Sequence, residues 1–468
     1  MDLPERIAIA FVGASVVATL GLGGAVAFEL GSRTTGTTVA PLAPGSGTAD
    51  TSTPTPGSAD AVTPGAGPAV AGGTTVSSGG THSGGGASSG GGSGVALSNQ
   101  PIGVSHGVIT VGGMYDETGV LDSTVERDTV RAYFNQVNAQ GGVNGYKFQL
   151  IDCDSAYDPT RGHQCSQQLL GSNILAMVGP LSASSEQPEV PYLTSHGLPV
   201  IGGLGVPAEF SDPLSYPVSI DLARGATAQG LHTADLTTDA GTPIKAPGIV
   251  ILNTNFTQQT LKYLLDALHS KGIHEADVVT VDATKADYTD TVVDLRSKNV
   301  DSIIGGLDPF SYGRLFQAMQ SQQFKVKFFG SGLDKGSAEE QYGNDAFGNA
   351  ESLTPLVEPV GHESDTAVAE YLNAIKKYFP SQMSKLDVYS EGDWVAAKLF
   401  VEAVKRIGSQ PVTRQSLVNS LNGIKDFQTG LTVPLSYAAE NSHDPNHCLQ
   451  WIKRANNTWD TYSGWNCF

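Results

Sequence analysis

The sequence predicts an α/β protein with two similar lobes, each built on a parallel β-sheet. From Val108 onward, short apolar runs alternate with amphipathic stretches, which is typical of buried parallel strands covered by helices. Eight such runs are many for one sheet of this kind, and they divide into two groups of four near residues 221–230. Each group opens with a strand, a loop of small or polar residues and an amphipathic helix. This weak internal repeat supports the division into two lobes.

The eight expected strands are short, continuous apolar segments. Several of them stop at Gly or Pro, which often marks a turn of the chain near a ligand. They are Val108–Val111, Phe148–Ile151, Leu175–Val178, Pro199–Ile201, Ile249–Leu252, Val278–Val281, Ser302–Ile304 and Val326–Phe329.

The helices between them have recognisable ends. Ser123 and Glu126 form a capping-box pattern. Asp158 precedes Pro159, so an N-cap residue stands before a proline in the first helical position. Further helices are expected along Leu261–Leu268, closed by Gly272, and along Trp394–Val404, ending near Gly408.

The N-terminus is expected to carry an export signal. Ile7–Phe28 is apolar and uncharged, and about 20 helical residues suffice to span a bilayer. Residues 1–30 are therefore expected to form a signal-anchor or transmembrane segment that holds the protein at the cell membrane, facing outward. Ala25-Val26-Ala27 resembles a signal-peptidase site, so cleavage and secretion is the alternative.

Residues 31–98 are rich in Gly, Ser, Thr, Pro and Ala. Such a segment buries too little apolar surface to order itself, and it is expected to be a disordered linker. Residues 99–468 are then the folded domain. The chain carries a net charge of -19, which repels phosphate backbones and argues against nucleic-acid binding. We expect a monomer.

Four cysteines form two locally spaced pairs, and an even count in an exported chain predicts disulfides. Three connectivities are possible, of which the local one is the simplest. Metal ligation is the alternative because His443 and His447 lie close to one pair, although the spacing fits no tight zinc pattern. We expect disulfides and no metal. The local pairs are Cys153 with Cys165 and Cys448 with Cys467.

Two enzyme-like motifs occur in the wrong context. Gly103–Gly107 matches the G-x-S-x-G nucleophile elbow, but it precedes the first expected strand instead of following one. Gly203–Ala208 loosely matches a dinucleotide fingerprint, but it contains a proline and lacks the expected βαβ context. No phosphate loop of the G-x-x-x-x-G-K-[ST] form is present. The sequence therefore predicts neither an enzyme nor a cofactor.

Four segments in the same order resemble the leucine/isoleucine/valine-binding branch of the type I periplasmic binding proteins. They cover a helix-to-strand turn, the second strand with its following helix, the first ligand loop and the fourth strand of that family. They are Asn138–Gly145, Asp152–Asp154 with Asp158-Pro159, Val178–Pro188 and Gly197–Ile201.

This resemblance implies two Rossmann-like lobes joined by three crossings of the chain. The first lobe would comprise residues of about 105–223 and 357–429, and the second about 224–356 and 430–468. Ligands of such proteins bind at the carboxyl ends of the strands, and hinge closure buries them. The resemblance implies capture of a small polar ligand, amino-acid or amide-like, for an ABC permease. A sensory protein that signals to a membrane partner is the alternative.

In the first lobe, the resemblance places the ligand near two loops. The S-x-x-Q pattern that starts at Ser184 predicts free backbone N–H groups facing the cleft, which attract carboxylates; an ordinary N-cap is the alternative. Ala183 and Val206 occupy positions where amino-acid binders of the family have Ser and Thr, although a shift of one residue would restore Ser182 or Ser184. The candidates are Ser182, Ala183, Ser184, Leu204, Gly205 and Val206.

The remaining candidates follow other strands. Phe256 lies where the family often has an aromatic side chain that stacks on the ligand, and Asp308 and Asp334 could pair with a cationic group. We therefore expect a polar or cationic ligand in preference to leucine, isoleucine or valine. The candidates outside the two loops are Tyr115, Asp116, Asn255, Phe256, Asp308 and Asp334.

Overall fold

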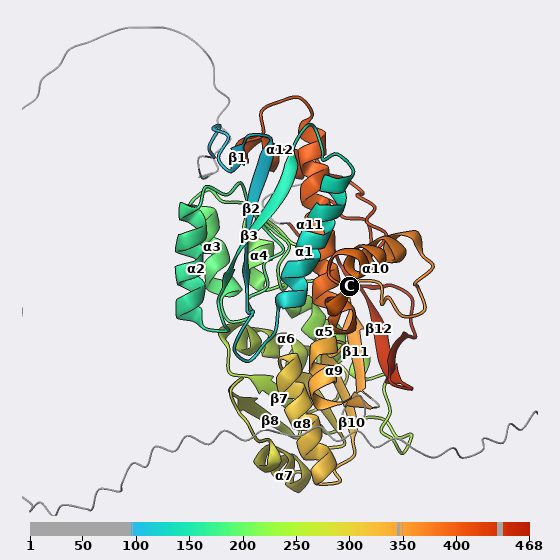
Figure 1. Ribbon diagram of the computed structural model, residues 1–468. Helices are drawn as coiled ribbons and strands as arrows, with labels where there is room; N and C mark the ends of the chain where they lie inside the picture. Colours follow the sequence, from blue (N-terminus) through green and yellow to red (C-terminus); the bar gives the residue numbers. More distant parts are fainter. Residues whose placement is uncertain (1–94, 96, 344–346, 349, 438–442) are drawn as a thin grey trace, which may run out of the picture. The chain divides into compact units, whose positions relative to one another are not determined.

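The computed structural model describes residues 95, 97–343, 347–348, 350–437 and 443–468. Residues 89–468 form one compact unit, in which Figure 1 shows two sheets, each flanked by helices. The expected N-terminal hydrophobic segment and almost all of the expected linker lie outside the described residues. The α/β class and the parallel-dominated sheets in two lobes are confirmed.

The sheet of the first lobe has the parallel order β3-β2-β4-β5-β6, and the short β1 pairs antiparallel with the start of β2. Four of the expected strands lie in it. The fifth parallel strand, β6, is only two residues long and has no apolar run that would reveal it. The strands are β1 (Val104–Ser105), β2 (Val108–Tyr115), β3 (Lys147–Asp154), β4 (Met177–Val178), β5 (Val200–Ile201) and β6 (Ser215–Tyr216).

The sheet of the second lobe repeats this arrangement and extends it. Its parallel part has the order β8-β7-β9-β10-β11, after which β12 and β13 continue the sheet in antiparallel pairing. The strands are β7 (Pro247–Leu252), β8 (Asp277–Val281), β9 (Ser302–Gly306), β10 (Lys327–Ser331), β11 (Ala350–Thr354), β12 (Cys448–Ala455), β13 (Thr458–Thr461) and β14 (Asn466–Cys467).

The shared strand order determines where a ligand can bind. Numbered within each lobe, both sheets have the order 2-1-3-4-5, so the chain reverses direction across the sheet between the first and third strands. Loops leaving those two strands diverge to opposite faces and leave a crevice at the carboxyl edge. In this protein the crevices lie after β2 and β4, and after β7 and β9.

Helices cover both faces of the first sheet. In Figure 1, α2 and α3 lie on one side of β2 and β3, and α1 and α11 lie on the other. The core between α1 and α11 centres on Trp394, whose ring meets Tyr133 edge-on at 4.8 Å between centroids. The helices are α1 (Thr124–Ala139), α2 (Pro159–Gly171), α3 (Glu186–Ser195), α4 (Pro207–Ser211), α10 (Thr366–Tyr378), α11 (Val388–Ile407) and α12 (Arg414–Asn422), with a 3-10 helix at Pro380–Lys385.

The second sheet is also covered on both faces. Successive side chains of a strand point to opposite faces: Ile249 and Ile251 pack in one core cluster with Leu264, whereas Val250 and Leu252 pack in another. A strand buried on both sides needs the continuous apolar run that the sequence shows. The helices are α5 (Leu222–Thr233), α6 (Asn255–Ser270), α7 (Thr289–Ser297), α8 (Pro309–Ser321) and α9 (Gly336–Tyr342).

The chain passes between the lobes three times. The first two crossings follow β6 and β11. The third lies later than the expected position near residue 430, because Leu431, Leu435 and Tyr437 pack in the core of the first lobe. The Tyr437 hydroxyl also donates a hydrogen bond to the Pro217 carbonyl at 2.6 Å. The segment after Gly430 therefore belongs to the first lobe as far as Tyr437.

Both predicted local disulfides are present. Cys153 on β3 is bonded to Cys165 on α2, and Cys448 on β12 to Cys467 on β14. Each disulfide therefore joins neighbouring elements of one lobe. His443, considered above as a metal ligand, stacks on Tyr216 and bonds to the Ser215 carbonyl.

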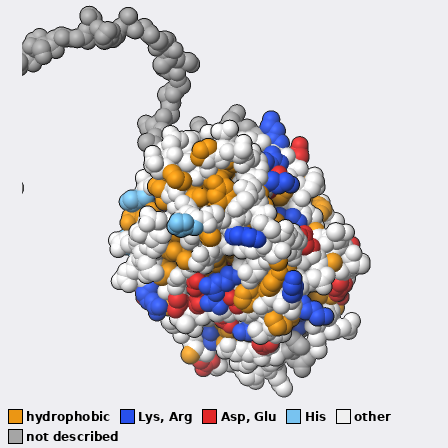
Figure 2. All heavy atoms as spheres, turned by 45° about the horizontal axis from the view of Figure 1, so that its top comes forward, with side chains coloured by type: hydrophobic (Ala, Val, Ile, Leu, Met, Phe, Trp, Pro, Cys, Tyr) orange, Lys and Arg blue, Asp and Glu red, His pale blue; other side chains and the backbone are white. Residues whose placement is uncertain are grey.

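The face of the molecule in Figure 2 is mixed in charge and also carries hydrophobic side chains. On the face in Figure 2, acidic and basic side chains lie beside one another instead of forming blocks of one sign. Within the described residues, no helix is both long and apolar enough to cross a membrane. The expected membrane segment lies outside those residues.

Removal of the first disulfide tests its contribution to stability. The Cys153→Ala/Cys165→Ala double variant should unfold with a free energy about 3 kcal/mol lower, because the bond closes a loop of 12 residues. Urea denaturation measures the difference. The unreduced wild type, labelled in denaturant, serves as the control and should expose no thiol. A loss below about 1 kcal/mol would contradict a stabilising role.

Candidate functional site

A cavity with an empty space of about 1130 Å³, part of it open to solvent, is lined by residues of both lobes. Most of the lining side chains are aliphatic. From the first lobe come Leu121, Ser123, Tyr157, Leu181, Ala183, Leu204 and Tyr389. From the second lobe and the crossing before it come, among others, Ile220, Leu222, Ala226, Ile251, Phe256, Leu261, Leu264, Leu307, Asp308 and Lys335. The cavity thus opens at the crevices of both sheets.

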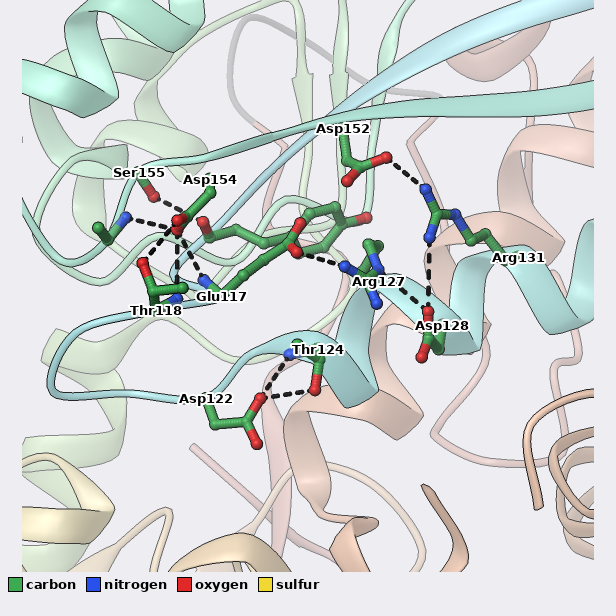
Figure 3. Close-up of polar contacts among 12 residues, drawn as sticks. Glu117, Thr118, Asp122, Thr124, Arg127, Asp128, Arg131, Asp152, Asp154 and Ser155 are labelled. Carbon is green, nitrogen blue, oxygen red and sulfur yellow. Dashed lines mark hydrogen bonds and ion pairs between the residues drawn. The ribbon is translucent and has the colours of Figure 1, made fainter. Parts of the chain in front are cut away.

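The loop from β2 to α1 carries Leu121 and Ser123 and is held by polar contacts (Figure 3). The Asp154 carboxylate accepts from the Glu117 and Thr118 N–H groups at 3.1 and 3.2 Å, and from the Thr118 hydroxyl at 2.6 Å. Arg127 forms an ion pair with Glu117. These contacts fix the loop from β3 and α1, so the two lining residues are presented on a braced segment.

Asp116 lies outside the cavity lining and holds the first ligand loop in place through hydrogen bonds. It is fully buried, and its carboxylate accepts from the Ala183 N–H at 2.8 Å, the Tyr157 N–H at 2.7 Å and the hydroxyls of Ser155 and Ser182 at 2.7 and 3.2 Å. Burial raises the pKa of Asp116, while these four hydrogen bonds oppose the rise. The carboxylate therefore holds protein groups and does not line the cavity.

A buried pair of glutamates joins the two loops. Glu186 accepts from the Ser182 N–H at 2.6 Å and from the Leu204 N–H at 2.7 Å. Glu209 accepts from the N–H groups of Gly205 and Val206 at 3.1 and 3.3 Å. The two glutamates thus accept the hydrogen bonds that backbone N–H groups of a binding loop could otherwise donate to a ligand.

The raised pKa values of the two glutamates indicate that they share a proton. Burial raises the pKa of Glu186 to about 7, and it raises that of Glu209 further because the Glu186 charge adds to it. Glu209 therefore keeps its proton and donates it to the Glu186 carboxylate. The N–H groups of Ser182 and Ala183, just before the S-x-x-Q pattern, are not free, because internal carboxylates accept from both. Free N–H groups at the pattern that starts at Ser184 stay a prediction.

The second-lobe candidates are divided. Phe256, on the first turn of α6, lines the cavity, whereas Asn255 beside it is exposed and does not. Asp308 lines the cavity, but it caps α8 and accepts from the N–H groups of Phe310 and Ser311 at 3.0 and 2.9 Å and from the Ser311 hydroxyl. Asp334 is buried outside the lining and accepts from the Val388 N–H at 3.0 Å.

Lys335 is the charged lining residue, among those described, that the sequence reasoning missed. It is 2% exposed, and its ammonium bonds to Glu126 on α1 and to Asp387 at the start of α11, both at 2.6 Å. Burial lowers the pKa of Lys335, but the two negative charges outweigh this and raise it overall. This ion pair joins the lobes. It also takes Glu126 away from the expected capping box, and the Ser123 side chain makes no cap hydrogen bond.

Four of the twelve predicted ligand residues line the cavity: Ala183, Leu204, Phe256 and Asp308. The others lie behind it, within the supporting structure or at the surface. The missed lining includes Leu261 and Leu264 of the leucine stripe of α6, which the sequence presents as an ordinary core-facing stripe. The predicted residues outside the lining are Tyr115, Asp116, Ser182, Ser184, Gly205, Val206, Asn255 and Asp334.

Two lobes with one strand order and a shared cavity at their carboxyl edges define a two-lobed binding protein. The chain belongs to the periplasmic binding protein family, whose model matches residues 108–457. It is 26% identical over 254 residues to the Leu/Ile/Val-binding protein of Escherichia coli K12 and 24% identical over 251 residues to the Leu/Ile/Val/Thr-binding protein of Salmonella typhimurium. The matches cover 51% of this chain and 64% of each relative. The resemblance to that branch is confirmed.

Solved structures share the fold. A fatty acid ABC transporter substrate-binding protein from Thermomonospora curvata aligns with a TM-score of 0.70 at 19% identity, over 79% of this chain and 95% of that one. A branched chain amino acid ABC transporter from Thermus thermophilus with bound valine aligns with a TM-score of 0.69 at 14% identity, over 77% and 97%. Such likeness establishes the fold alone.

The glutamate pair makes stability depend on pH in a predictable direction. Between the ordinary Glu pKa and about 7, the folded state binds more protons than the unfolded state, so the free energy of unfolding falls as pH rises. Glu209→Gln replaces the shared proton with a permanent amide donor and should flatten this fall. Urea denaturation at pH 5, 6, 7 and 8 measures both proteins. Parallel curves for wild type and variant would contradict the shared proton.

Proposed function

We propose that the protein is an extracytoplasmic solute-binding protein that captures a small ligand between its lobes and delivers it to an ABC-type permease. The observation that supports this most is a cavity lined from both lobes at the switch point of each sheet. A ligand there contacts both lobes, so its binding energy favours the closed arrangement of the hinge. Membership of the family supports an extracytoplasmic location and a binding role.

Anchoring at the membrane is part of this proposal. Ile7–Phe28 would hold the protein at the membrane, and residues 31–98 would act as a tether of on the order of 45 Å root-mean-square length. The binding domain would then stay near its permease. Cleavage after Ala27 and secretion is the alternative.

A sensory binding protein is the second candidate, because one fold serves both roles. The names of the relatives favour uptake, since two of the structural neighbours are ABC transporter proteins. An enzyme is disfavoured by the placement of its best motif: Ser105 ends the short β1 and is followed by another strand, β2, instead of standing between a strand and a helix.

Hinge closure is the direct test of the binding role. Spin labels at Lys405→Cys in the first lobe and Lys262→Cys in the second attach selectively, because the native cysteines are paired. A solute that raises the melting temperature, found by screening amino acids, aromatic acids and n-alkanols, should shorten the label distance by more than about 2 Å. The control pair Lys405→Cys/Lys376→Cys lies within one lobe and should not move. Stabilisation without any change between the lobes would contradict capture by closure.

The anchor is tested by the fate of the N-terminus. In the expressing cells, the full-length protein should fractionate with membranes and keep residues 1–30, because an uncleaved apolar helix of this length stays in the bilayer. Mass spectrometry of the mature chain decides the matter. A mature N-terminus at Phe28 would refute the anchor.

A further inference from the structure

The walls of the cavity are suited to an aliphatic molecule. Leu121 and Leu181 from the first lobe face a cavity whose other side carries Leu222, Leu261 and Leu264. Charged residues are rare in this lining, which contains only Asp308 and Lys335 among the described residues. A ligand that fills this space therefore gains mainly from burial of apolar surface.

The groups that would bind an α-amino acid are already occupied. In the two ligand loops, Asp116, Glu186 and Glu209 accept from the N–H groups of Ser182, Ala183, Leu204, Gly205 and Val206. Asp308 is engaged in its helix cap, and the Lys335 ammonium bonds to two carboxylates. An α-ammonium placed here would be desolvated without a free acceptor, at a cost of about 10-fold or more in affinity.

One polar side-chain group of the lining is both fully buried and unpaired among the described residues. The Ser123 hydroxyl is fully buried, lines the cavity and has no hydrogen-bond partner among the described residues. Lys335 belongs to the same lining, and an ammonium has three donors, of which two are used by Glu126 and Asp387. These groups offer hydrogen bonds to one oxygen-bearing head group.

We infer that the ligand is an aliphatic-chain molecule whose single polar group is an oxygen-bearing head, and that the head contacts Ser123. This inference rests on the proposed function and specifies its ligand class. Free alcohols and fatty acids share this chemistry. Both the aliphatic walls and the occupied loop N–H groups favour it over the amino-acid or amide-like ligand predicted from the sequence.

Chain length tests the class. Isothermal titration of the full-length protein with n-alkanols from hexanol to decanol should show affinity rising about fourfold per added CH₂ until the cavity is filled. The matching alkanoates form a second series that distinguishes an alcohol head from a carboxylate head. Leucine should bind at least 100-fold more weakly than the best member of either series.

A matched pair of variants locates the chain. Leu261 and Leu265 both lie on α6 and pack against the same core cluster, but only Leu261 lines the cavity. Leu261→Asn should weaken decanol binding at least tenfold, whereas Leu265→Asn should leave it within threefold of wild type. Ser123→Ala should weaken the alkanols roughly two- to twelvefold through the lost hydrogen bond. Equal losses from both leucine variants would overturn the placement.

The outcomes separate the two proposals. Micromolar binding of leucine without chain-length dependence among the alkanols would overturn the ligand class and leave the solute-binding role standing. Absence of binding by both aliphatic series would also overturn the class. If every other solute in the screen failed as well, the solute-binding role would fall with it.

Discussion

The buried backbone N–H groups at the carboxyl edge of the first sheet need hydrogen-bond acceptors, and this need shapes the site. A buried N–H without a partner costs about 1–3 kcal/mol. Here Asp116, Glu186 and Glu209 supply the acceptors from within the protein. The two loops can therefore keep their form without a ligand carboxylate, and the surface they leave to the cavity is largely apolar.

A buried charged group is also paired within the protein where the lobes meet. Lys335 on the second lobe is buried between Glu126 and Asp387 of the first. Loss of one partner of such a buried group typically costs 3–5 kcal/mol, because the remaining charge is left uncompensated. The two lobes are thus joined by a buried ion pair that lies beside an apolar cavity. Movement of the lobes must keep this contact or exchange it for water.

The features that could be predicted from the sequence are those that depend on residues close together in the chain. Continuous apolar runs located eight strands, and close spacing located both disulfides. These patterns missed β11, whose residues Ala350–Thr354 include Glu351 paired with Lys327 and so show no apolar run. The site was harder because its contacts are distant in sequence: the Ala183 N–H meets Asp116 from 67 positions away. The sequence does not distinguish a serine or aspartate that faces a ligand from one that holds a loop in place.

A crystal structure of the protein with decanol tests the central claim most directly. We expect an alkyl chain beside Leu261, with its oxygen within hydrogen-bond distance of the Ser123 hydroxyl. The N–H groups of Ser182, Ala183 and Leu204 should keep their bonds to Asp116 and Glu186. The same crystals should also be soaked with leucine. A leucine carboxylate bonded to those N–H groups, with Glu186 displaced, would contradict the proposed ligand class.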